Sequence, residues 1–309
     1  MVQVYKVDQS FDHKMFTNSS CAFGVFDGVH IGHQYLLSCA QDTAKENGGM
    51  SIALTFDIDP DELFHAERLK KLMSNETRIE FLAQSGVDMV VFLPFTSEFA
   101  AMTPHEFLEN TFNGCAPSHL HVGLDFRFGA KAAGTVADLG EWGAHCGCHI
   151  DAHNLKSADG DPITATRIRL LLAQHKLDEA KELLGRPYFL REQVKPGRGQ
   201  GVDMGFSTAN LIVPSNRQVL EEGVYAAYAI VDGKRYKAAV SVGVSPVFAS
   251  ETQASCEVHI LDFSGDIYGE FIDVEFVEYL RPMIKFDSTD ELIKTVLGNI
   301  EYVRTHLSL

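Results

Sequence analysis

Two histidines three residues apart follow a short apolar run near the N-terminus. His30 and His33 stand in the stretch FDGVHIGHQ. The apolar run predicts a buried strand over residues 21–26, Asp27 and Gly28 predict a turn, and the spacing that follows predicts a helix from about residue 30. A strand, a glycine turn and a helix start together present backbone N–H groups and the positive end of a helix dipole to a phosphate.

The residues of this stretch suit phosphate chemistry. Gly32 stands between the histidines and has no Cβ where a phosphate must approach the backbone. Imidazoles three residues apart share one helix face, and they can donate hydrogen bonds to negative charge that develops on phosphate oxygens. The alternative is that the two histidines are ordinary polar residues at a helix start. The glycine, the turn and the preceding strand favour a phosphate site.

Length and composition bound the class of protein. A chain of 309 residues favours two domains. The net charge of −16 argues against general binding to nucleic acid or to anionic membranes. No apolar run approaches the length of a membrane span. Six cysteines without a regular framework, and an N-terminus without the apolar core of a signal peptide, indicate free thiols in the cytoplasm.

The first half of the sequence alternates apolar runs with helical spacing. This pattern predicts βαβ units and a parallel sheet. The expected strands lie at residues 21–26, 51–56, 88–94 and 119–122, and the expected helices at 30–47, 68–84 and from 103 onward. Parallel sheets bind ligands at the carboxyl ends of their strands. The histidine motif, Asp57 and residues 123–129 all follow an expected strand, which predicts one site at that edge.

The second half has a different pattern. Alternating β-branched residues, separated by short turns, predict an antiparallel barrel or sandwich, and a helical pattern closes the chain. The expected strands lie at residues 223–231, 235–244, 255–263 and 271–276, and the helix at 287–307. Its chemical candidates are a glycine-rich run at 197–201, the stretch GFSTAN at 205–210, and Glu257. Each has a plainer interpretation, as a flexible turn or as the solvated face of a strand.

Two further clusters of polar residues need interpretation. The stretch ITATRIR at 163–169 places two arginines at an expected helix start, where they suit bidentate phosphate contact or an ordinary surface helix. The stretch HCGCH at 145–149 holds soft metal ligands without the second pair that a zinc site usually has. His121 and His153 could join such a site only by chance of the fold. We therefore expect a helix end that runs into a strand.

These stretches together resemble the bacterial FAD synthetases, the bifunctional riboflavin kinase/FMN adenylyltransferases. The resemblance rests on FDGVHIGHQ, on TFD at 55–57, on GLDFRFG at 123–129, on ITATRIR, and on LGRPY at 184–188, where the second module of that family begins. It implies a Rossmann-like α/β nucleotidyltransferase domain with a parallel sheet over residues 1–185. It also implies a riboflavin kinase-like antiparallel β-barrel with a terminal helix over residues 186–309.

The resemblance implies roles for residues of the first domain. The implied reaction is FMN + ATP → FAD + pyrophosphate, with Mg²⁺ as the cofactor and ATP and FMN as substrates. His30, His33 and Arg169 would be catalytic. The residues implied to bind the nucleotide are Phe26, Gly28, Gly32, Asp57, Asp125 and Thr166.

The resemblance also implies roles in the second domain, where riboflavin and ATP would give FMN and ADP. Glu257 would take the proton from the riboflavin 5′-hydroxyl, and Thr208 and Asn210 would bind Mg-ATP. Gly199 and Gly201 would lie along the phosphates. The partners implied for the whole chain are these small molecules, with no nucleic acid and no membrane, and the oligomeric state is open.

The sequence departs from the family pattern at several positions. In the first half a Pro-His pair of the family is replaced by Ile58 and Asp59, and its two serines by Thr164 and Ala165. In the second half Ser207 replaces a proline, Val202 an arginine and Val247 a threonine. Riboflavin kinase activity is therefore an open second activity. The alternatives are an adenylyltransferase with a kinase-inactive flavin-binding barrel, a non-catalytic flavin- or nucleotide-binding regulator, and a nucleotidyltransferase acting on another phosphate ester.

Overall fold

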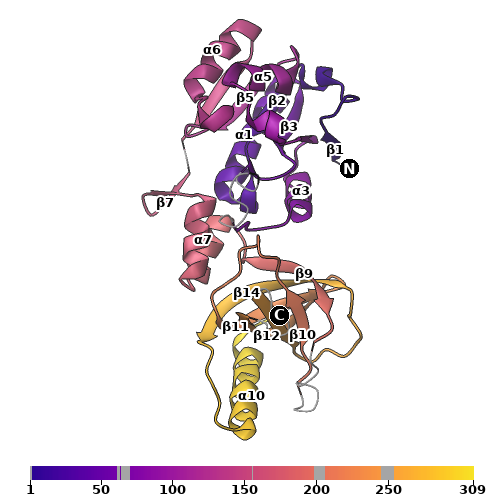
Figure 1. Ribbon diagram of the computed structural model, residues 1–309, viewed down its shortest axis with the longest axis vertical. Coiled ribbons are helices and arrows are strands. Elements are labelled where there is room, and N and C mark those ends of the chain that lie inside the picture. Colours follow the sequence, from indigo (N-terminus) through magenta and orange to yellow (C-terminus); the bar gives the residue numbers. More distant parts are fainter. Residues whose placement is uncertain (1, 61–62, 64–69, 155, 198–205, 245–253) are drawn as a thin grey trace. The chain divides into compact units, whose positions relative to one another are not determined.

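The computed structural model describes residues 2–60, 63, 70–154, 156–197, 206–244 and 254–309. The chain divides into two compact units, Met1–Ala165 and Thr166–Leu309 (Figure 1). The boundary expected after residue 185 refers to functional domains and stays a prediction. Each unit is described below by itself.

In the first unit the described residues form a six-stranded sheet in which every neighbouring pair is parallel. Its order is β1-β4-β3-β2-β5-β6. The strands are β1 (Gln3–Lys6), β2 (Ser19–Phe23), β3 (Met50–Phe56), β4 (Met89–Leu93), β5 (His119–Gly123) and β6 (His149–His153). Strand β2 pairs with β3 on one side and β5 on the other, so the order reverses there. In such sheets the ligand crevice opens beyond the carboxyl ends of the strands at this point.

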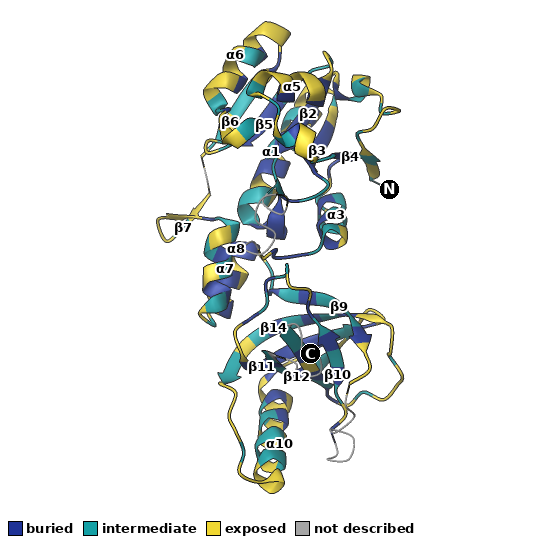
Figure 2. Ribbon diagram, viewed as in Figure 1, coloured by how far each residue is buried: buried dark blue, intermediate teal, exposed yellow. Residues whose placement is uncertain are grey.

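Helices cover both faces of this sheet. Side chains alternate between the faces along each strand, and apolar side chains on both faces must be buried. On one face Ala22, Ala53 and Val90 pack against α1 (Ile31–Asn47) and α3 (Asn75–Gln84). On the other, larger side chains such as Phe23 and Leu54 pack against α4 (Ser97–Ala100), α5 (Pro104–Phe112) and α6 (Val136–Cys146). Figure 2 shows the buried residues gathered along the strands and the inner sides of these helices. The parallel α/β fold expected from the sequence is confirmed.

Short segments complete the first unit, and two expectations about element bounds were wrong. The segments are η1 (His13–Phe16), η2 (Asp27–Val29), η3 (Ala130–Ala132), β7 (Ser157–Ala158) and β8 (Asp161–Pro162). The strand expected at 21–26 ends at Phe23, before a tight turn. The helix expected at 68–84 is not helical between 70 and 74, and it begins at Asn75 because the Ser74 side chain accepts from the Thr77 N–H as an N-cap.

In the second unit, the described strands close into an antiparallel barrel in the order β10-β13-β12-β11-β14-β9. The strands are β9 (Phe189–Lys195), β10 (Ala209–Ile212), β11 (Gly223–Val231), β12 (Lys234–Val244), β13 (Ala254–Ile260) and β14 (Phe271–Arg281). Strand β14 is longer than the expected 271–276. The helices are α7 (Ala165–Ala173), α8 (Leu177–Leu184) and α10 (Thr289–His306). The barrel expected for the second half is confirmed.

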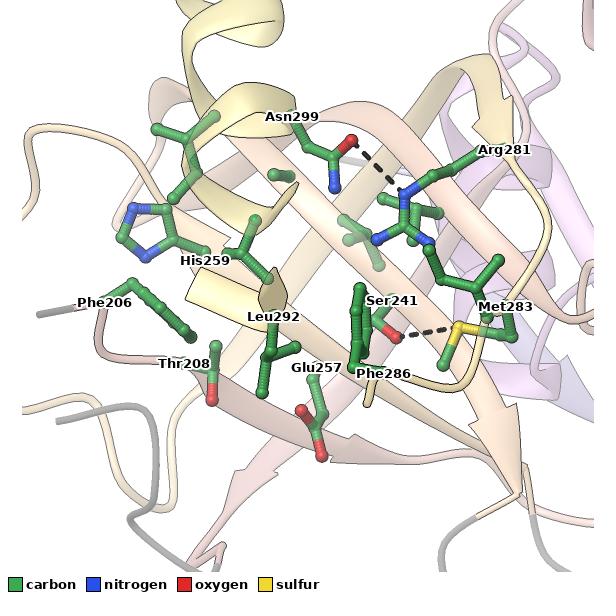
Figure 3. A pocket seen from close by; sticks show the side chains of 16 residues that line it. Phe206, Thr208, Ser241, Glu257, His259, Arg281, Met283, Phe286, Leu292 and Asn299 are labelled. Atoms are coloured by element: carbon green, nitrogen blue, oxygen red, sulfur yellow. Dashed lines mark hydrogen bonds between the residues drawn. The ribbon is translucent and has the colours of Figure 1, made fainter. Parts of the chain in front are cut away.

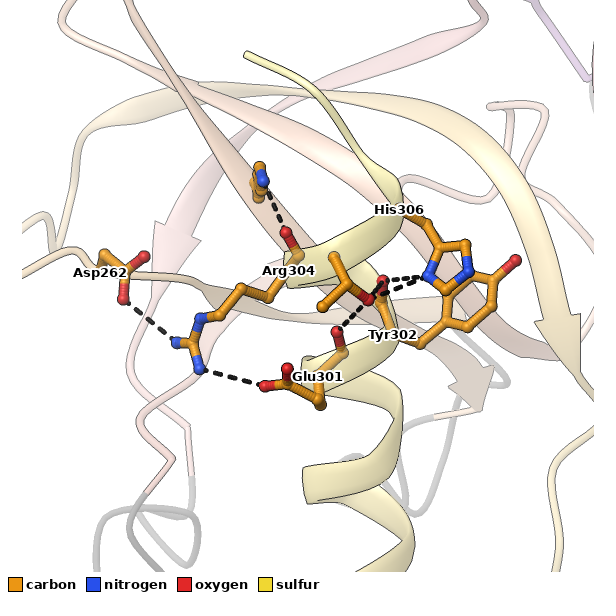
Figure 4. Close-up of polar contacts among 7 residues, drawn as sticks. Asp262, Glu301, Tyr302, Arg304 and His306 are labelled. Carbon is orange, nitrogen blue, oxygen red and sulfur yellow. Dashed lines mark hydrogen bonds and ion pairs between the residues drawn. The ribbon is translucent and has the colours of Figure 1, made fainter.

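Helix α10 packs on the outside of the barrel through apolar and polar contacts. Ile300 and Val303 are buried against Ala226 and Tyr228 of β11. At the end of the helix, the Arg304 guanidinium reaches Asp262 at 3.1 Å, and the Arg304 carbonyl accepts from Lys237 Nζ at 2.6 Å (Figure 4). A cation at the carbonyl end of a helix also interacts favourably with its dipole. The expected terminal helix is therefore a fixed part of the second unit.

Candidate active sites

The turn after β2 shapes the first candidate site. Between Phe23 and His30 the backbone is left-handed at Phe26 (φ 58°), Gly28 (φ 76°) and Val29 (φ 37°). Glycine adopts such angles freely, but a β-branched residue such as valine does so only under strain. Strained backbone of this kind concentrates at functional sites, where the surrounding structure holds it in place. The turn delivers the chain directly to the start of α1.

His30 is the N-cap of α1. Its Nδ1 accepts a hydrogen bond from the His33 backbone N–H at 3.3 Å, and its side chain is buried. The neutral ring with Nδ1 as the acceptor carries its proton on Nε2. The rings of His30 and His33 stack with centroids 3.5 Å apart and an interplanar angle of 17°. The structure thus brings the two predicted histidines together at one helix N-terminus.

His33 sits in a desolvated position. Burial, with the nearby His30 and Arg78 as further causes, holds the pKa of His33 well below its ordinary value. The imidazole is therefore neutral near pH 7. Its Nδ1 is buried and has no hydrogen-bond partner among the described residues. The Phe26 ring meets the His33 ring edge-on at 5.2 Å, which places one predicted nucleotide-binding residue beside the histidine pair.

Gly32 leaves room for the His30 ring. A Cβ on Gly32 would lie 3.1 Å from His30 Nδ1 and 3.7 Å from the carbonyl oxygen of Ile163. Ile163 is the first residue of ITATRIR, so the start of that segment lies beside the histidine motif. Thr166 and Arg169 stand on α7 in the second unit. Their predicted contacts with ATP phosphates stay predictions.

Two buried charged residues that the sequence analysis did not single out hold the turn in place. Arg78 of α3 is 3% exposed, and its guanidinium donates to the Val25 and Phe56 carbonyls, both at 2.6 Å. Asp27 is 6% exposed and accepts from the Leu72 N–H at 3.0 Å. Arg78 lay within an expected amphipathic helix, and the spacing gave no signal of its burial. Asp27 gave only a turn signal.

Asp57 and Asp125 both follow strands, as expected. The Asp57 carboxylate pairs with Lys6 Nζ at 2.9 Å and accepts from the Phe95 N–H at 2.8 Å. Burial alone would raise the pKa of Asp57, but the Lys6 ammonium and the backbone donors outweigh it and lower the pKa. Asp125 is exposed on the turn after β5. Their roles in nucleotide binding stay predictions.

The second candidate site lies on the barrel. Asn210, Glu257 and Ser241 stand directly opposite one another on the adjacent strands β10, β13 and β12. Residues opposite each other in an antiparallel pair point to the same face. Glu257, Ser241 and Thr208 also line a pocket of about 260 Å³. The register thus brings three predicted residues, Thr208, Asn210 and Glu257, close to one another.

The pocket is mainly apolar with polar groups at its ends. Figure 3 shows Thr208 and Glu257 at one end, and Arg281, which donates to Asn299 at 3.4 Å, at the other. The apolar lining includes Phe206, Val240, Met283, Ile284, Phe286, Leu292 and Val296. A slot of this kind suits a flat, largely apolar ring system that carries a polar chain.

The described residues also bear on one departure from the family pattern. The Ser207 carbonyl accepts from His259 Nδ1 at 2.8 Å. This bond restrains the backbone before Thr208, where the family's proline would restrain it. Gly199, Gly201, Val202 and Val247 lie outside the described residues, so the predictions for them stay as they were.

A parallel sheet with paired histidines at its reversal point, joined to a closed barrel with a mainly apolar pocket that Glu257 borders, is the architecture of a two-module nucleotide-dependent transferase. Comparison with protein families agrees. Residues 12–167 match the family model for FAD synthetase, and residues 184–307 match the model for riboflavin kinase. The chain belongs to the family of bifunctional riboflavin kinase/FMN adenylyltransferases.

Its relatives include proteins of that description from several bacteria. The Listeria monocytogenes protein is 33% identical over 89% of this chain and 88% of its own length. The Escherichia coli K12 protein is 34% identical over 87% of this chain and 86% of its own length.

A solved Streptococcus pneumoniae structure is also similar, with a TM-score of 0.83 and 29% identity over 94% of this chain and 95% of that one. That protein is described as a macrolide-efflux protein. In the part of this chain that the structure describes, no helix has the length and apolar character to cross a membrane.

Proposed function

We propose that the chain makes FAD from riboflavin in two steps, the second of which is adenylyl transfer from ATP to FMN. The observation that carries the second step is the stacked pair His30–His33 at the N-terminus of α1, beyond the strand where the sheet order reverses. A helix N-terminus binds phosphate through its free N–H groups and its dipole. ATP, FMN and riboflavin are the substrates of the proposal.

In this step an FMN phosphate oxygen attacks the α-phosphorus of ATP, and the bond from that phosphorus to pyrophosphate breaks. His30, with its proton on Nε2, and neutral His33 donate hydrogen bonds to oxygens that gain charge. Arg169 and Thr166 bind the departing pyrophosphate. Such chemistry depends on positioning and electrostatic stabilisation. Mg²⁺ bound to the ATP substrate would neutralise part of the phosphate charge.

The first step is phosphorylation of riboflavin at the barrel. Glu257 takes the proton from the 5′-hydroxyl, which then attacks the γ-phosphorus of ATP and releases ADP. Thr208 and Asn210 offer hydroxyl and amide oxygens, the hard donors that Mg²⁺ prefers. The His259–Ser207 bond supports kinase activity, because it fixes the backbone that aims Thr208. We place both steps in the cytoplasm, which suits the six cysteines: all are in the described part of the chain and all are free thiols.

The test is to incubate the full chain with Mg-ATP and either riboflavin or FMN, and to separate the flavins by chromatography. We expect FAD from both substrates. His33→Ala should raise the barrier of FAD formation from FMN by roughly 2–4 kcal/mol, while FMN formation from riboflavin continues. Glu257→Gln should slow FMN formation from riboflavin, while FAD formation from FMN continues.

Each other outcome identifies an alternative. FAD from FMN alone would leave an adenylyltransferase whose barrel only binds flavin. Flavin binding without turnover would indicate a regulator. Turnover of ATP with a different phosphate ester, not inhibited by FMN, would indicate another nucleotidyltransferase.

A further inference from the structure

Five polar side chains gather on β6, an edge strand of the first unit's sheet, and on its neighbour β5. His119 stands opposite His149, His121 opposite Asp151, and His153 follows at the end of β6. Side chains at every second position of a strand share a face. The intervening Leu120 and Val122 belong to the core on the α5 and α6 side, so the histidines and the aspartate point to the face that carries α1.

Three of these side chains have donor atoms close enough to share one ion. His119 Nδ1 lies 2.9 Å from Asp151 Oδ2, and His121 Nε2 lies 3.7 Å from the same oxygen. All three donor atoms fall within 4.8 Å of one another. Ligands of a tetrahedral zinc ion, bound at about 2.0–2.2 Å, are about 3.3–3.5 Å apart. Both measured separations to Asp151 differ from that range by less than 0.5 Å. Small side-chain rotations are enough to bring the donor atoms to these separations.

The second nitrogen of His121 is already oriented as it is in metal sites. His121 Nδ1 lies 2.9 Å from His153 Nε2, and Nε2 lies 3.0 Å from Ser20 Oγ. If Nδ1 donates to His153, Nε2 presents a lone pair, which accepts from the serine hydroxyl or binds an ion. Metal-bound histidines usually donate their other N–H in this way, and the bond fixes the orientation of the ring.

The cluster of His119, His121 and Asp151 is buried on one side and partly exposed to solvent on the other. The His121 side chain is 3% exposed, whereas those of His119 and Asp151 are 22% and 28% exposed. An ion could therefore enter from the solvent side and keep a water molecule as a fourth ligand. The His149 ring, with its centroid 5.0 Å from that of His119, is near enough to replace that water after a side-chain rotation.

We propose that His119, His121 and Asp151 form a binding site for a divalent transition-metal ion, with His153 as the residue that positions His121. Two imidazoles and one carboxylate favour Zn²⁺ and its neighbours over Mg²⁺ and Ca²⁺, which prefer oxygen ligands. The ion would connect β5 to β6. The His153 ring also meets Tyr35 of α1 edge-on at 5.7 Å. Occupancy therefore stabilises the edge of the sheet against α1, the helix that His30 caps.

The test uses the full chain after a chelator has removed bound metal. The binding buffer contains excess Mg²⁺ and no ATP. Zn²⁺ is titrated by calorimetry, and Co²⁺ by its visible absorption, which reports coordination by nitrogen and oxygen. We expect one ion per chain at this site. His119→Ala and Asp151→Asn should each weaken binding at least a hundredfold, and His153→Ala should weaken it less, about tenfold. Saturating Zn²⁺ should raise the thermal midpoint of the parent protein and not that of His119→Ala.

Matched controls come from the same unit. His145→Ala and Cys146→Ala each remove an exposed side chain of a type that binds metals, a few residues before β6 in the sequence. Both variants should leave binding unchanged. His33→Ala tests whether the ion binds to the histidine motif instead. Loss of binding in any of these three variants, or full affinity in both His119→Ala and Asp151→Asn, would overturn the proposal. Circular dichroism of each stripped variant checks its fold. If one ligand variant unfolds, the other still gives the comparison.

Discussion

Replacing Gly32 by alanine tests the geometry of the histidine pair with a single methyl group. The new Cβ would lie 3.1 Å from His30 Nδ1 and 3.2 Å from its Cε1, so the ring must move by a few tenths of an ångström to restore ordinary contact. The hydrogen bond from the His33 N–H to His30 is already 3.3 Å long and would weaken. Loss of an N-cap costs about 1 kcal/mol, and alanine within a helix recovers up to about 1 kcal/mol.

We therefore expect the stability of Gly32→Ala to stay within about 1 kcal/mol of the parent while its catalysis falls. A misplacement of about 1 Å can cost about a hundredfold in rate, so a shift of a few tenths should cost about tenfold, or ~1.4 kcal/mol of barrier. The assay is the initial rate of FAD formation from FMN and Mg-ATP, with urea unfolding measured in parallel.

The matched control is Gly140→Ala, which adds a methyl to a helix of the same unit where nothing lies within 4 Å. It should keep the full rate and gain slightly in stability. A Gly32→Ala protein that forms FAD at the parental rate would refute the argument, because the position of His30 would then not limit the reaction.

Two further predictions concern buried charge. Arg78→Met should lower the free energy of unfolding by about 3–5 kcal/mol in urea titrations, because it leaves the Val25 and Phe56 carbonyls without their donors. Arg78→Lys should lose nearly as much, since an ammonium lacks the fork that bridges two acceptors, and a stable lysine variant would contradict this. His33 has a pKa below that of an unfolded histidine, so the unfolded state binds more protons and stability falls as the pH drops below about 6.5. His33→Gln should show a shallower fall between pH 7.5 and 5.5, and an unchanged slope would mean that the folded protein does not hold His33 neutral.

Periodicity predicted the fold class because the two halves bury apolar residues in different ways. The parallel strands are hydrophobic on both faces, as Ala22 and Phe23 illustrate. In the barrel, β13 and β14 alternate between buried and more exposed residues, whereas β11 is buried along nearly its whole length. The error at residues 70–74 comes from a contact between segments far apart in the sequence. Leu72 continued a helical pattern, but its N–H donates to Asp27, and Ser74 caps the helix only afterwards. A tertiary hydrogen bond to a residue 45 positions away leaves no periodic signal.

The candidate sites were predictable to the extent that their residues are close in sequence. His30 and His33 are neighbours on one helix turn, so their spacing alone implied their contact. Glu257 and Asn210 are brought together by strand register, which a short alternating pattern does not fix. The cluster at His119, His121 and Asp151 is the extreme case. Single residues on two strands gave no motif, and only the pairing of β5 with β6 assembled them.

The support of the turn at residues 26–29 links stability to catalysis. Left-handed backbone at Phe26 and Val29 costs about 1–3 kcal/mol per residue, so an isolated peptide would not hold this conformation. Arg78 binds the carbonyl just before the turn, and Asp27 within it accepts from the chain segment that leads to α3. Both are buried, and a buried charge without its partners is more costly still. The turn, and with it the start of α1 at His30, is therefore held by the same contacts that stabilise the first unit. It follows that Arg78 variants should lose FAD synthesis at denaturant concentrations where their sheet is still folded, because the strained turn relaxes first.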